Sequence, residues 1–283
     1  MPNWFKLAKL LRPPLALGLA FLVAGCPPPA PSRSSPTGGR VATTVTPPPP
    51  SPLALSPEPE PLPASPSWRP ITGRLVVLDA GHGGNDRGAS HFGVREKDVN
   101  LDLVKRLALR LENQGITVIL TRRQDVFLPL PERSSIANQY PQAIFVSIHC
   151  NASTNNPAAT GVETFVLSRQ ADNAARQARA GKRYQVTGGD QALATLLARS
   201  RERAPALAQA LQNTLATRLG VPNRGVKQAD LAVLRETFFC PAILVEVGFI
   251  SNATTANQMA SAAWRGLAAE ALAEGIVDYL RKS

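Results

Sequence analysis

Two of the three histidines in this chain stand at the ends of apolar runs of strand length. His82 follows the run 75–78 after a short Asp-Ala-Gly segment, and His149 directly follows the run 143–148. An apolar run that stops at a polar residue is typical of a buried strand that ends at a ligand crevice. Together with Glu96, these histidines form a His2Glu set, which binds catalytic zinc and leaves a fourth position for water. The sequence therefore predicts one Zn2+ site made of His82, Glu96 and His149.

The third histidine leaves one alternative open. Glu96 stands at the predicted start of a helix, where a carboxylate often serves only to stabilise the helix dipole. Its role as a ligand is therefore favoured only by the presence of the two histidines. His91, in a predicted loop, could replace Glu96, but we favour for it a loop position that faces solvent or substrate. The glycines around His82 permit a sharp turn. Without a Gly-x-Gly-x-x-Gly pattern or a Walker lysine, they do not predict a phosphate-binding loop.

Glu246 is the one charged residue in the apolar segment 242–250. An ionised carboxylate inside such a segment is costly unless it is paired or lies beside a metal. Burial and a nearby cation would also tune its pKa, as a general base requires. We therefore predict Glu246 as the general base beside a metal-bound water, with a solvent-facing position on an edge strand as the alternative.

Apolar periodicity predicts alternating strands and helices from residue 75 to residue 280. The predicted strands are 75–78, 116–120, 143–148, 162–167, 231–234 and 242–247, and the predicted helices are 99–111, 130–139, the leucine stripe 207–219, and 262–280. Such alternation indicates an α/β fold with a single twisted, mostly parallel (mixed) sheet and helices on both faces.

The cysteines Cys150 and Cys240 could form a disulfide in an oxidising compartment. Cys150 ends a predicted strand, whereas Cys240 precedes one. If those strands are parallel, the two residues lie at opposite edges of the sheet, beyond the Cα separation of about 7 Å that a disulfide spans. We therefore predict no bond between them.

Residues 1–26 have the features of an export signal. Lys6, Lys9 and Arg12 precede the apolar segment 15–24, which is too short to span a bilayer as a helix. The segment ends in Leu-Val-Ala-Gly-Cys, which resembles a bacterial lipobox with Cys26 as the lipidated residue. We expect an exported lipoprotein of the periplasm or cell envelope, attached to a membrane through a lipid anchor at Cys26. An ordinary signal cleaved nearby, or an uncleaved anchor, is the alternative.

Proline accounts for 16 of the 44 residues from 27 to 70. Such a segment cannot bury a core, so we predict a disordered linker with an upper reach of about 130 Å, at about 3.1 Å per residue. Residues 71–283 form the predicted single domain, with 25 basic against 18 acidic residues. Segment 169–203 alone has 8 basic and 3 acidic residues. This positive charge favours an anionic partner, and a wall polymer or membrane is preferred because an exported protein rarely meets nucleic acid. The alternative is that the basic residues only keep the helix surface solvated.

Four segments together resemble the zinc-dependent N-acetylmuramoyl-L-alanine amidases of the third amidase type. They are Asp-Ala-Gly-His-Gly-Gly at 79–84, Arg-Glu-Lys at 95–97, Ser-Ile-His-Cys-Asn-Ala at 147–152 and Leu-Val-Glu-Val-Gly-Phe-Ile-Ser-Asn at 244–252. The resemblance runs in the family's order from about residue 75 to residue 280, and 225–227 and 231–235 extend it. One departure is Cys150, where the family usually has alanine. Because the two side chains have similar volumes, we expect no loss of activity.

The resemblance implies that His82, Glu96 and His149 bind zinc and that Glu246 is the catalytic glutamate. The implied reaction is hydrolysis of the amide between N-acetylmuramic acid and L-alanine of the peptidoglycan stem peptide, in an open, shallow cleft. Cell-wall remodelling or daughter-cell separation is the implied process. The rival hypotheses are a zinc peptidase that cuts within the stem peptide and an inactive, lipid-anchored wall-binding protein.

The segment of about 169–203 is an insertion relative to minimal members of that family. Some relatives carry an insertion here with a helix that blocks the zinc until an activator protein removes it. Asp172 and Asp190 are the acidic residues that could cap the metal in this way. A wall-binding or simply solvated excursion is the favoured alternative. Because the insertion follows residue 167, we expect it near the sheet edge that carries His149.

Overall fold

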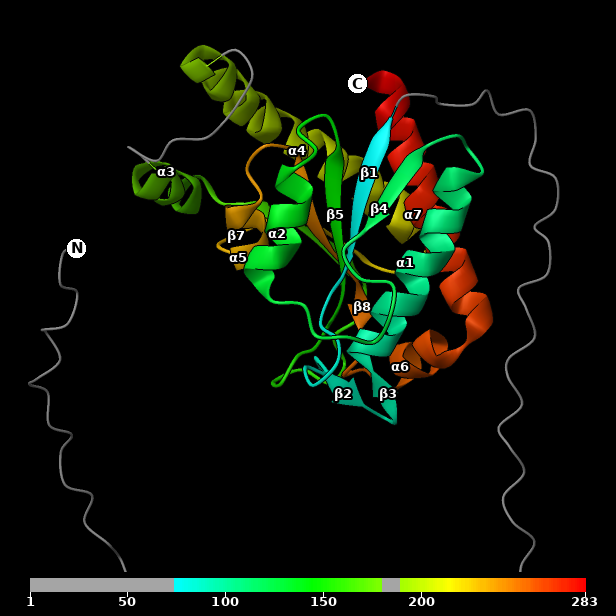
Figure 1. The fold of residues 1–283 in the computed structure, drawn as a ribbon. Coiled ribbons are helices and arrows are strands. Elements are labelled where there is room, and N and C mark those ends of the chain that lie inside the picture. Colours follow the sequence, from blue (N-terminus) through cyan, green and yellow to red (C-terminus); the bar gives the residue numbers. More distant parts are fainter. Residues whose placement is uncertain (1–73, 180–188) are drawn as a thin grey trace, which may run out of the picture. The chain divides into compact units, whose positions relative to one another are not determined.

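A computed structural model describes residues 74–179 and 189–283 of the chain (Figure 1). The predicted signal peptide, the lipobox cysteine Cys26 and the proline-rich linker lie outside the described residues. Among the helices that the structure describes, none combines the length and apolarity needed to cross a membrane.

A six-stranded sheet with the order β4-β1-β5-β8-β6-β7 forms the centre of the domain. Neighbouring strands are parallel except β6 and β8, which are antiparallel. The predicted α/β class with a mostly parallel, mixed sheet is thereby confirmed. The strands are β1 (Leu75–Ala80), β4 (Thr117–Leu120), β5 (Ile144–Asn151), β6 (Val162–Leu167), β7 (Asn223–Ala229) and β8 (Ala242–Phe249).

Helices cover both faces of this sheet (Figure 1). Alternate strand residues point to opposite faces, so Val76 and Leu78 join one buried cluster while Val77 joins the other. The larger cluster includes the apolar stripes of three long helices, and the smaller one packs beneath two short helices. The helices of the larger cluster are α1 (Glu96–Glu112), α4 (Gly189–Leu219) and α7 (Ala262–Lys282), and those of the smaller are α2 (Leu130–Asn138) and α5 (Ala232–Glu236).

Five elements differ from the sequence prediction. Segment 231–234 was predicted as a strand but forms the start of α5, because a four-residue apolar run does not distinguish a strand from a helix. Strand β7 was missed because its sequence, Asn-Arg-Gly-Val-Lys-Gln-Ala, is polar. The sequence pattern also did not predict the hairpin of β2 (Ser90–His91) and β3 (Val94–Arg95) or the short helix α6 (Ala253–Ala260).

The expected position of the basic insertion beside His149 is wrong. Because β6 runs antiparallel to β8, only the start of β6 lies at the edge that carries His149. Leu167 follows Glu163 by four residues and so lies about 13 Å further along the strand, toward the opposite edge. The insertion begins there as α3 (Arg169–Arg179), and the Ser200 hydroxyl in α4 donates to the Cys240 carbonyl, just before β8. The described part of the insertion is thus remote from the predicted zinc site.

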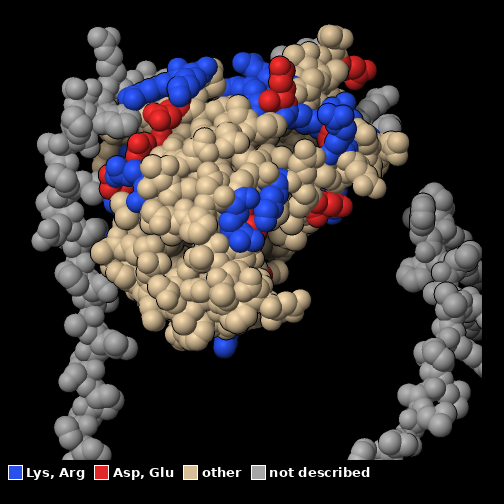
Figure 2. Space-filling model, turned by 180° about the vertical axis from the view of Figure 1, so that it is seen from behind, with Lys and Arg blue, Asp and Glu red and all other residues tan. Residues whose placement is uncertain are grey.

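The acidic residues proposed as a cap also point elsewhere. Asp172 forms ion pairs with Arg176 and Arg201, within the insertion itself. Asp190 is exposed at the start of α4. Figure 2 shows the face seen from behind, where basic side chains gather toward the end away from the hairpin, with acidic ones among them. Neither aspartate is therefore placed to cover His82 or His149.

Candidate metal centre

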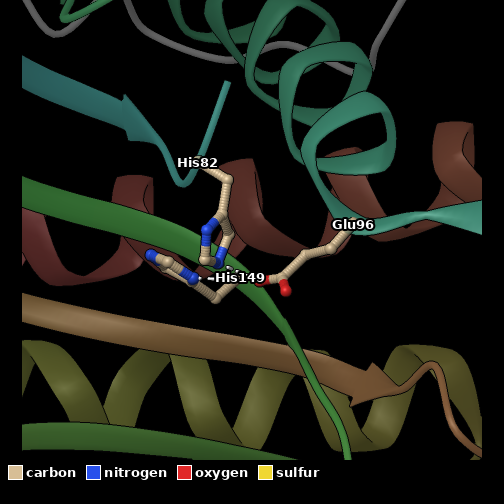
Figure 3. A group of neighbouring side chains, drawn as sticks. All are labelled: His82, Glu96 and His149. Carbon is tan, nitrogen blue, oxygen red and sulfur yellow. Dashed lines mark hydrogen bonds and ion pairs between the residues drawn. The ribbon is translucent and has the colours of Figure 1, made fainter. Parts of the chain in front are cut away.

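His82, Glu96 and His149 converge at one point beyond the sheet (Figure 3). Glu96 Oε1 lies 3.1 Å from His82 Nε2 and 3.0 Å from His149 Nδ1. Among the described residues this is the one group of three potential ligands whose donor atoms all lie within 4.8 Å of one another. The two imidazole rings meet edge to face, with their centroids 4.9 Å apart. One ion could contact all three donor atoms at once.

The parallel pairing of β1 and β5 brings the two histidines together. Ala80 is in register with Ile148, so His82, just past the end of β1, lies beside His149 near the end of β5. Glu96 is the first residue of α1, directly after the hairpin, and its Oε2 accepts a hydrogen bond from the Ala89 backbone N–H at 2.8 Å. Each ligand therefore comes from a different element that ends at the same edge of the sheet.

Hydrogen bonds orient the His82 ring and its backbone. Asp86 Oδ2 lies 2.8 Å from His82 Nδ1, which leaves Nε2 directed toward Glu96. Such a carboxylate partner fixes the ring and raises its basicity as a metal ligand. His82 has a φ of 61°, an uncommon conformation for a residue other than glycine, and Arg133 donates to its carbonyl at 2.8 Å. The backbone at His82 is thus held by the protein itself.

A buried ion pair anchors this loop to the sheet. Arg133 Nη1 donates to Asp79 Oδ1 and to the Ala80 carbonyl, at 2.8 and 2.7 Å. Asp79 also accepts hydrogen bonds from the hydroxyls of Thr121 and Ser147 at 2.6 and 2.7 Å. Removing one partner of such a pair leaves an uncompensated buried charge and costs about 3–5 kcal/mol. This network was not predicted, although an aspartate beside an apolar run is the same kind of signal that identified Glu246.

Two glycines leave the space that the ligands occupy. A Cβ atom on Gly81 would lie 2.3 Å from the ring of His149. A Cβ on Gly88 would lie 2.5 Å from Glu96 Oε2 and 2.6 Å from His82 Cδ2, and Gly88 also has a positive φ of 62°. Glycine is therefore required at both positions if the three ligands are to meet.

The charges of the three ligands are strongly coupled in the metal-free protein. Burial disfavours the charged form of His82, but hydrogen bonds and charge from Glu96 and Asp86 outweigh it and raise the pKa of His82 to about 9. Burial likewise disfavours ionised Glu96, yet the two histidines hold the pKa of Glu96 well below its ordinary value. A cation would take over the role of the proton on His82, so the metal must displace that proton in order to bind.

Glu246 lies one strand away from His149, in register with it across β5 and β8. Burial is the main cause that raises the pKa of Glu246, to a net value of about 7; the charge of His149 lowers it, and the negative charges of Glu96 and Glu163 raise it. Its Oε2 atom is buried and has no hydrogen-bond partner in the described part of the chain. A buried carboxylate with an open acceptor beside three ligand side chains is suited to take a proton from a water molecule there.

The alternative ligand His91 lies outside this group, exposed in the β2–β3 hairpin. Cys150 is buried behind the ligands, and its backbone N–H donates a hydrogen bond to Glu96 Oε1 at 3.1 Å. Burial raises the pKa of the Cys150 thiol well above its ordinary value. Cys150 and Cys240 are both free and buried. The parallel arrangement of β5 and β8, on which the prediction of no disulfide rested, is present.

The metal-free protein is expected to lose stability as the pH rises from about 5 to about 9. The pKa values of Glu246 and His82, about 7 and about 9, lie above their ordinary values of 4.5 and 6.5. Both groups therefore bind protons more tightly in the folded state, and their contribution to stability is lost as the pH rises through the folded values. Thermal unfolding in a chelator at about pH 5, 7 and 9 measures this trend. A melting temperature that increases across the range would contradict it, and Glu246→Gln should flatten the lower part.

The family described as N-acetylmuramoyl-L-alanine amidase matches residues 76–278. The chain is 34% identical to the amidase LytC of Bacillus subtilis, over 75% of this chain and 36% of LytC. It is also 34% identical to the amidase AmiA of Escherichia coli, over 73% of this chain and 76% of AmiA. The chain thus spans about a third of the length of LytC and about three quarters of that of AmiA.

Solved amidase structures have the same fold. AmiC2 of Nostoc punctiforme superposes with a TM-score of 0.60 at 33% identity, over 74% of this chain and 99% of that one. The CwlD amidase of Clostridioides difficile, solved in complex with the GerS lipoprotein, superposes with a TM-score of 0.60 at 26% identity, over 74% of this chain and all of CwlD. The fold, the family match and the identities agree with the resemblance in the sequence motifs. This chain therefore belongs to the N-acetylmuramoyl-L-alanine amidase family of peptidoglycan hydrolases.

Proposed function

We propose that this protein hydrolyses the amide bond between N-acetylmuramic acid and L-alanine of the stem peptide, with one Zn2+ held by His82, Glu96 and His149. The observation that carries the proposal is the convergence of these three donors beside Glu246, whose buried Oε2 has no hydrogen-bond partner among the described residues. Two imidazoles and one carboxylate are a donor set of catalytic zinc sites that keep a position open for water. The residues present therefore fit the metal that the family uses.

Zn2+ held by His82, Glu96 and His149 would polarise the scissile carbonyl and would lower the pKa of a water molecule to about 7. Glu246 accepts the proton of that water as it attacks the carbonyl carbon. Glu246 then donates the proton to the nitrogen of L-alanine, which leaves as a free amine. In the absence of metal, burial raises the pKa of Glu246 to about 7, so this group exchanges protons near neutral pH. Asp86 holds the His82 ring, and Arg133 holds the backbone of the same loop.

Product analysis of digested peptidoglycan tests this proposal against its rivals. The amidase reaction releases stem peptides that begin with a free L-alanine amine and leaves glycan strands without peptides. A zinc peptidase would release shortened stems, and an inactive wall-binding protein would release nothing. We expect intact stems, no release in the presence of a chelator, and recovery on addition of zinc. Shortened stems or zinc-independent release would overturn the proposal.

We further propose that the protein acts outside the cytoplasm, in the periplasm or cell envelope, tethered by lipid at Cys26. The basic start, short apolar segment and lipobox-like end of residues 1–26 support the anchor, and the proline-rich segment 27–70 would supply reach toward the wall. The basic insertion would contact anionic wall polymer. A protein activator is also part of this proposal, supported by the solved complex of the CwlD amidase with a lipoprotein.

Replacing the lipobox cysteine should detach the protein from the membrane. In Cys26→Ala there is no thiol to accept the lipid, so we expect a soluble or uncleaved form in cell fractionation. Mass spectrometry of the mature protein should find a lipidated Cys26 at its N-terminus in the wild type. An unmodified residue other than Cys26 at that terminus would contradict the anchor. Cys240→Ala, which changes a buried cysteine of the catalytic domain, is the matched control and should stay membrane-bound.

A further inference from the structure

A row of polar side chains continues from the predicted zinc site across the sheet. His149 on β5 is in register with Glu246 on β8, and Glu246 is in register with Glu163 on β6. Residues in register on neighbouring strands point to the same face, about 5 Å apart. The row therefore runs from a metal ligand through the predicted base to Glu163. The mechanism proposed above makes no use of Glu163.

Glu163 is a buried carboxylate, with 5% of its side chain exposed. Its Oε1 accepts a hydrogen bond from Asn151 Nδ2 at 2.6 Å. Its Oε2 accepts from Arg224 Nε at 2.8 Å and from Lys227 Nζ. Burial disfavours its charge, but these two cations hold the pKa of Glu163 below its ordinary value. Two positive charges thus meet one negative charge at the end of the row, and a net positive charge remains.

The two cations are only partly covered, unlike their carboxylate. The side chains of Arg224 and Lys227 are 38% and 40% exposed. Arg224 is also fixed in orientation, because its guanidinium lies over the ring of Phe249, 4.8 Å from the centroid. A guanidinium held along one edge and one face still offers its other N–H groups to a planar carboxylate.

A bulge in β7 directs these side chains toward the row. The register of β6 and β7 shifts between the pairs Val162↔Asn223 and Thr164↔Val226, so Arg224 and Gly225 both lie opposite Glu163. Bulges of this kind re-aim side chains and are frequent next to active sites. The extra residue explains how one short polar strand supplies both cations to the same carboxylate.

We propose that Arg224 and Lys227 form a subsite that binds a carboxylate of the stem peptide, and that Glu163 is the residue that positions them. The inference rests on the proposed function. The residue that follows L-alanine in a stem peptide is acidic, so its free carboxylate lies about two residues, or about 7 Å, from the scissile amide. Arg224 lies two strands from Glu246, so their backbones are about 10 Å apart in the sheet. The long arginine side chain can span the few ångströms between this distance and the about 7 Å that separate the carboxylate from the scissile amide.

Matched substrates test the subsite in the wild-type enzyme itself. One contains N-acetylmuramoyl-L-alanyl-D-glutamate and the other D-isoglutamine in place of D-glutamate, with the γ-carboxyl group in amide linkage to the next stem residue in both. The two substrates then differ only in the α-carboxylate two residues from the scissile amide, which is an amide in the second. We expect kcat/KM to be about 10- to 100-fold higher for the carboxylate, the factor that charge-assisted hydrogen bonds contribute. The difference should lie mainly in KM, because the subsite binds the carboxylate equally well in the ground state and in the transition state. Equal values for the two substrates would overturn the subsite.

Variants identify the residues responsible. Arg224→Gln/Lys227→Gln should reduce kcat/KM for the carboxylate substrate to the value for its amide and leave the amide substrate unchanged. Glu163→Gln should raise KM for the carboxylate substrate alone, because the cations lose their anchor. Arg218→Gln, which removes one exposed charge paired with Glu270, is the control and should change neither substrate. A double variant that keeps the full preference for the carboxylate would contradict the assignment.

The design separates this inference from the proposed function. If the wild type released L-alanyl peptides from neither substrate nor from whole peptidoglycan, the proposed function would fail. If it cleaved both substrates equally well, the function would stand and the subsite would fail. Should the double variant unfold because Glu163 is left buried without its two cations, the triple variant that adds Glu163→Gln removes that charge and is measured in its place.

Discussion

Glu246→Gln is expected to lower kcat by at least about 10²-fold while zinc stays bound. Glutamine keeps the shape and the burial of the side chain but cannot accept the proton of the attacking water. The ligands are unaffected, because Glu246 lies beside His149 rather than within the group of His82, Glu96 and His149. The measurement is the rate of stem-peptide release from purified peptidoglycan, with zinc content determined on the same sample.

Glu236→Gln is the matched control for that experiment. Glu236 is an exposed glutamate at the end of α5 and pairs with Arg235, so its change should alter neither rate nor zinc content. A near-wild-type rate in Glu246→Gln would show that another group takes the proton. Loss of zinc along with activity would instead show that Glu246 belongs to the metal site.

Glu96→Ala is expected to abolish both zinc binding and activity. The carboxylate contacts both histidines through one oxygen, and its removal leaves two neutral donors and a cavity in a buried position. A three-ligand site tolerates little loss, because the metal is held by all its donors together. Zinc titration followed by calorimetry, combined with the release assay, measures both effects.

Two further variants make the ligand assignment specific. Glu112→Ala changes an exposed glutamate at the other end of α1 and should retain full zinc and rate. His91→Ala should also retain zinc, because His91 is exposed in the hairpin outside the ligand group. Full zinc occupancy in Glu96→Ala, with loss in His91→Ala, would exchange the two assignments.

The apolar strands and long amphipathic helices could be predicted from the sequence because their periodicity reflects burial directly. The runs 143–148 and 242–247 became the central strands β5 and β8, and the stripe at 207–219 became the buried face of α4. Strand β7 could not be predicted in this way. Its Arg224 and Lys227 contact the buried carboxylate of Glu163, and with these polar residues the strand has no apolar alternation.

The direction of β6 in the sheet could not be predicted from the sequence either, and this affects the site more than the missed strand β7. An apolar segment such as 162–167 has the same pattern whether it runs parallel or antiparallel to its neighbour. Only the pairing of Glu163 with Glu246 shows that its start, and not its end, adjoins the metal centre. Because β6 is antiparallel to β8, the insertion lies away from the metal centre and Glu163 lies close to it. The two histidine ligands could be predicted because each follows an apolar run, whereas Glu96, at the start of a helix, could be assigned only together with them.

The anchoring of the His82 loop has a consequence for how the enzyme handles its ion. Arg133 and Asp79 fix the backbone around His82 without any contribution from the metal. We therefore expect this loop to keep its conformation when the ion is removed. Stripping the ion should be reversible, and other divalent ions could be exchanged into the same scaffold. Cobalt, whose colour reports its coordination, would then serve as a spectroscopic reporter of substrate binding.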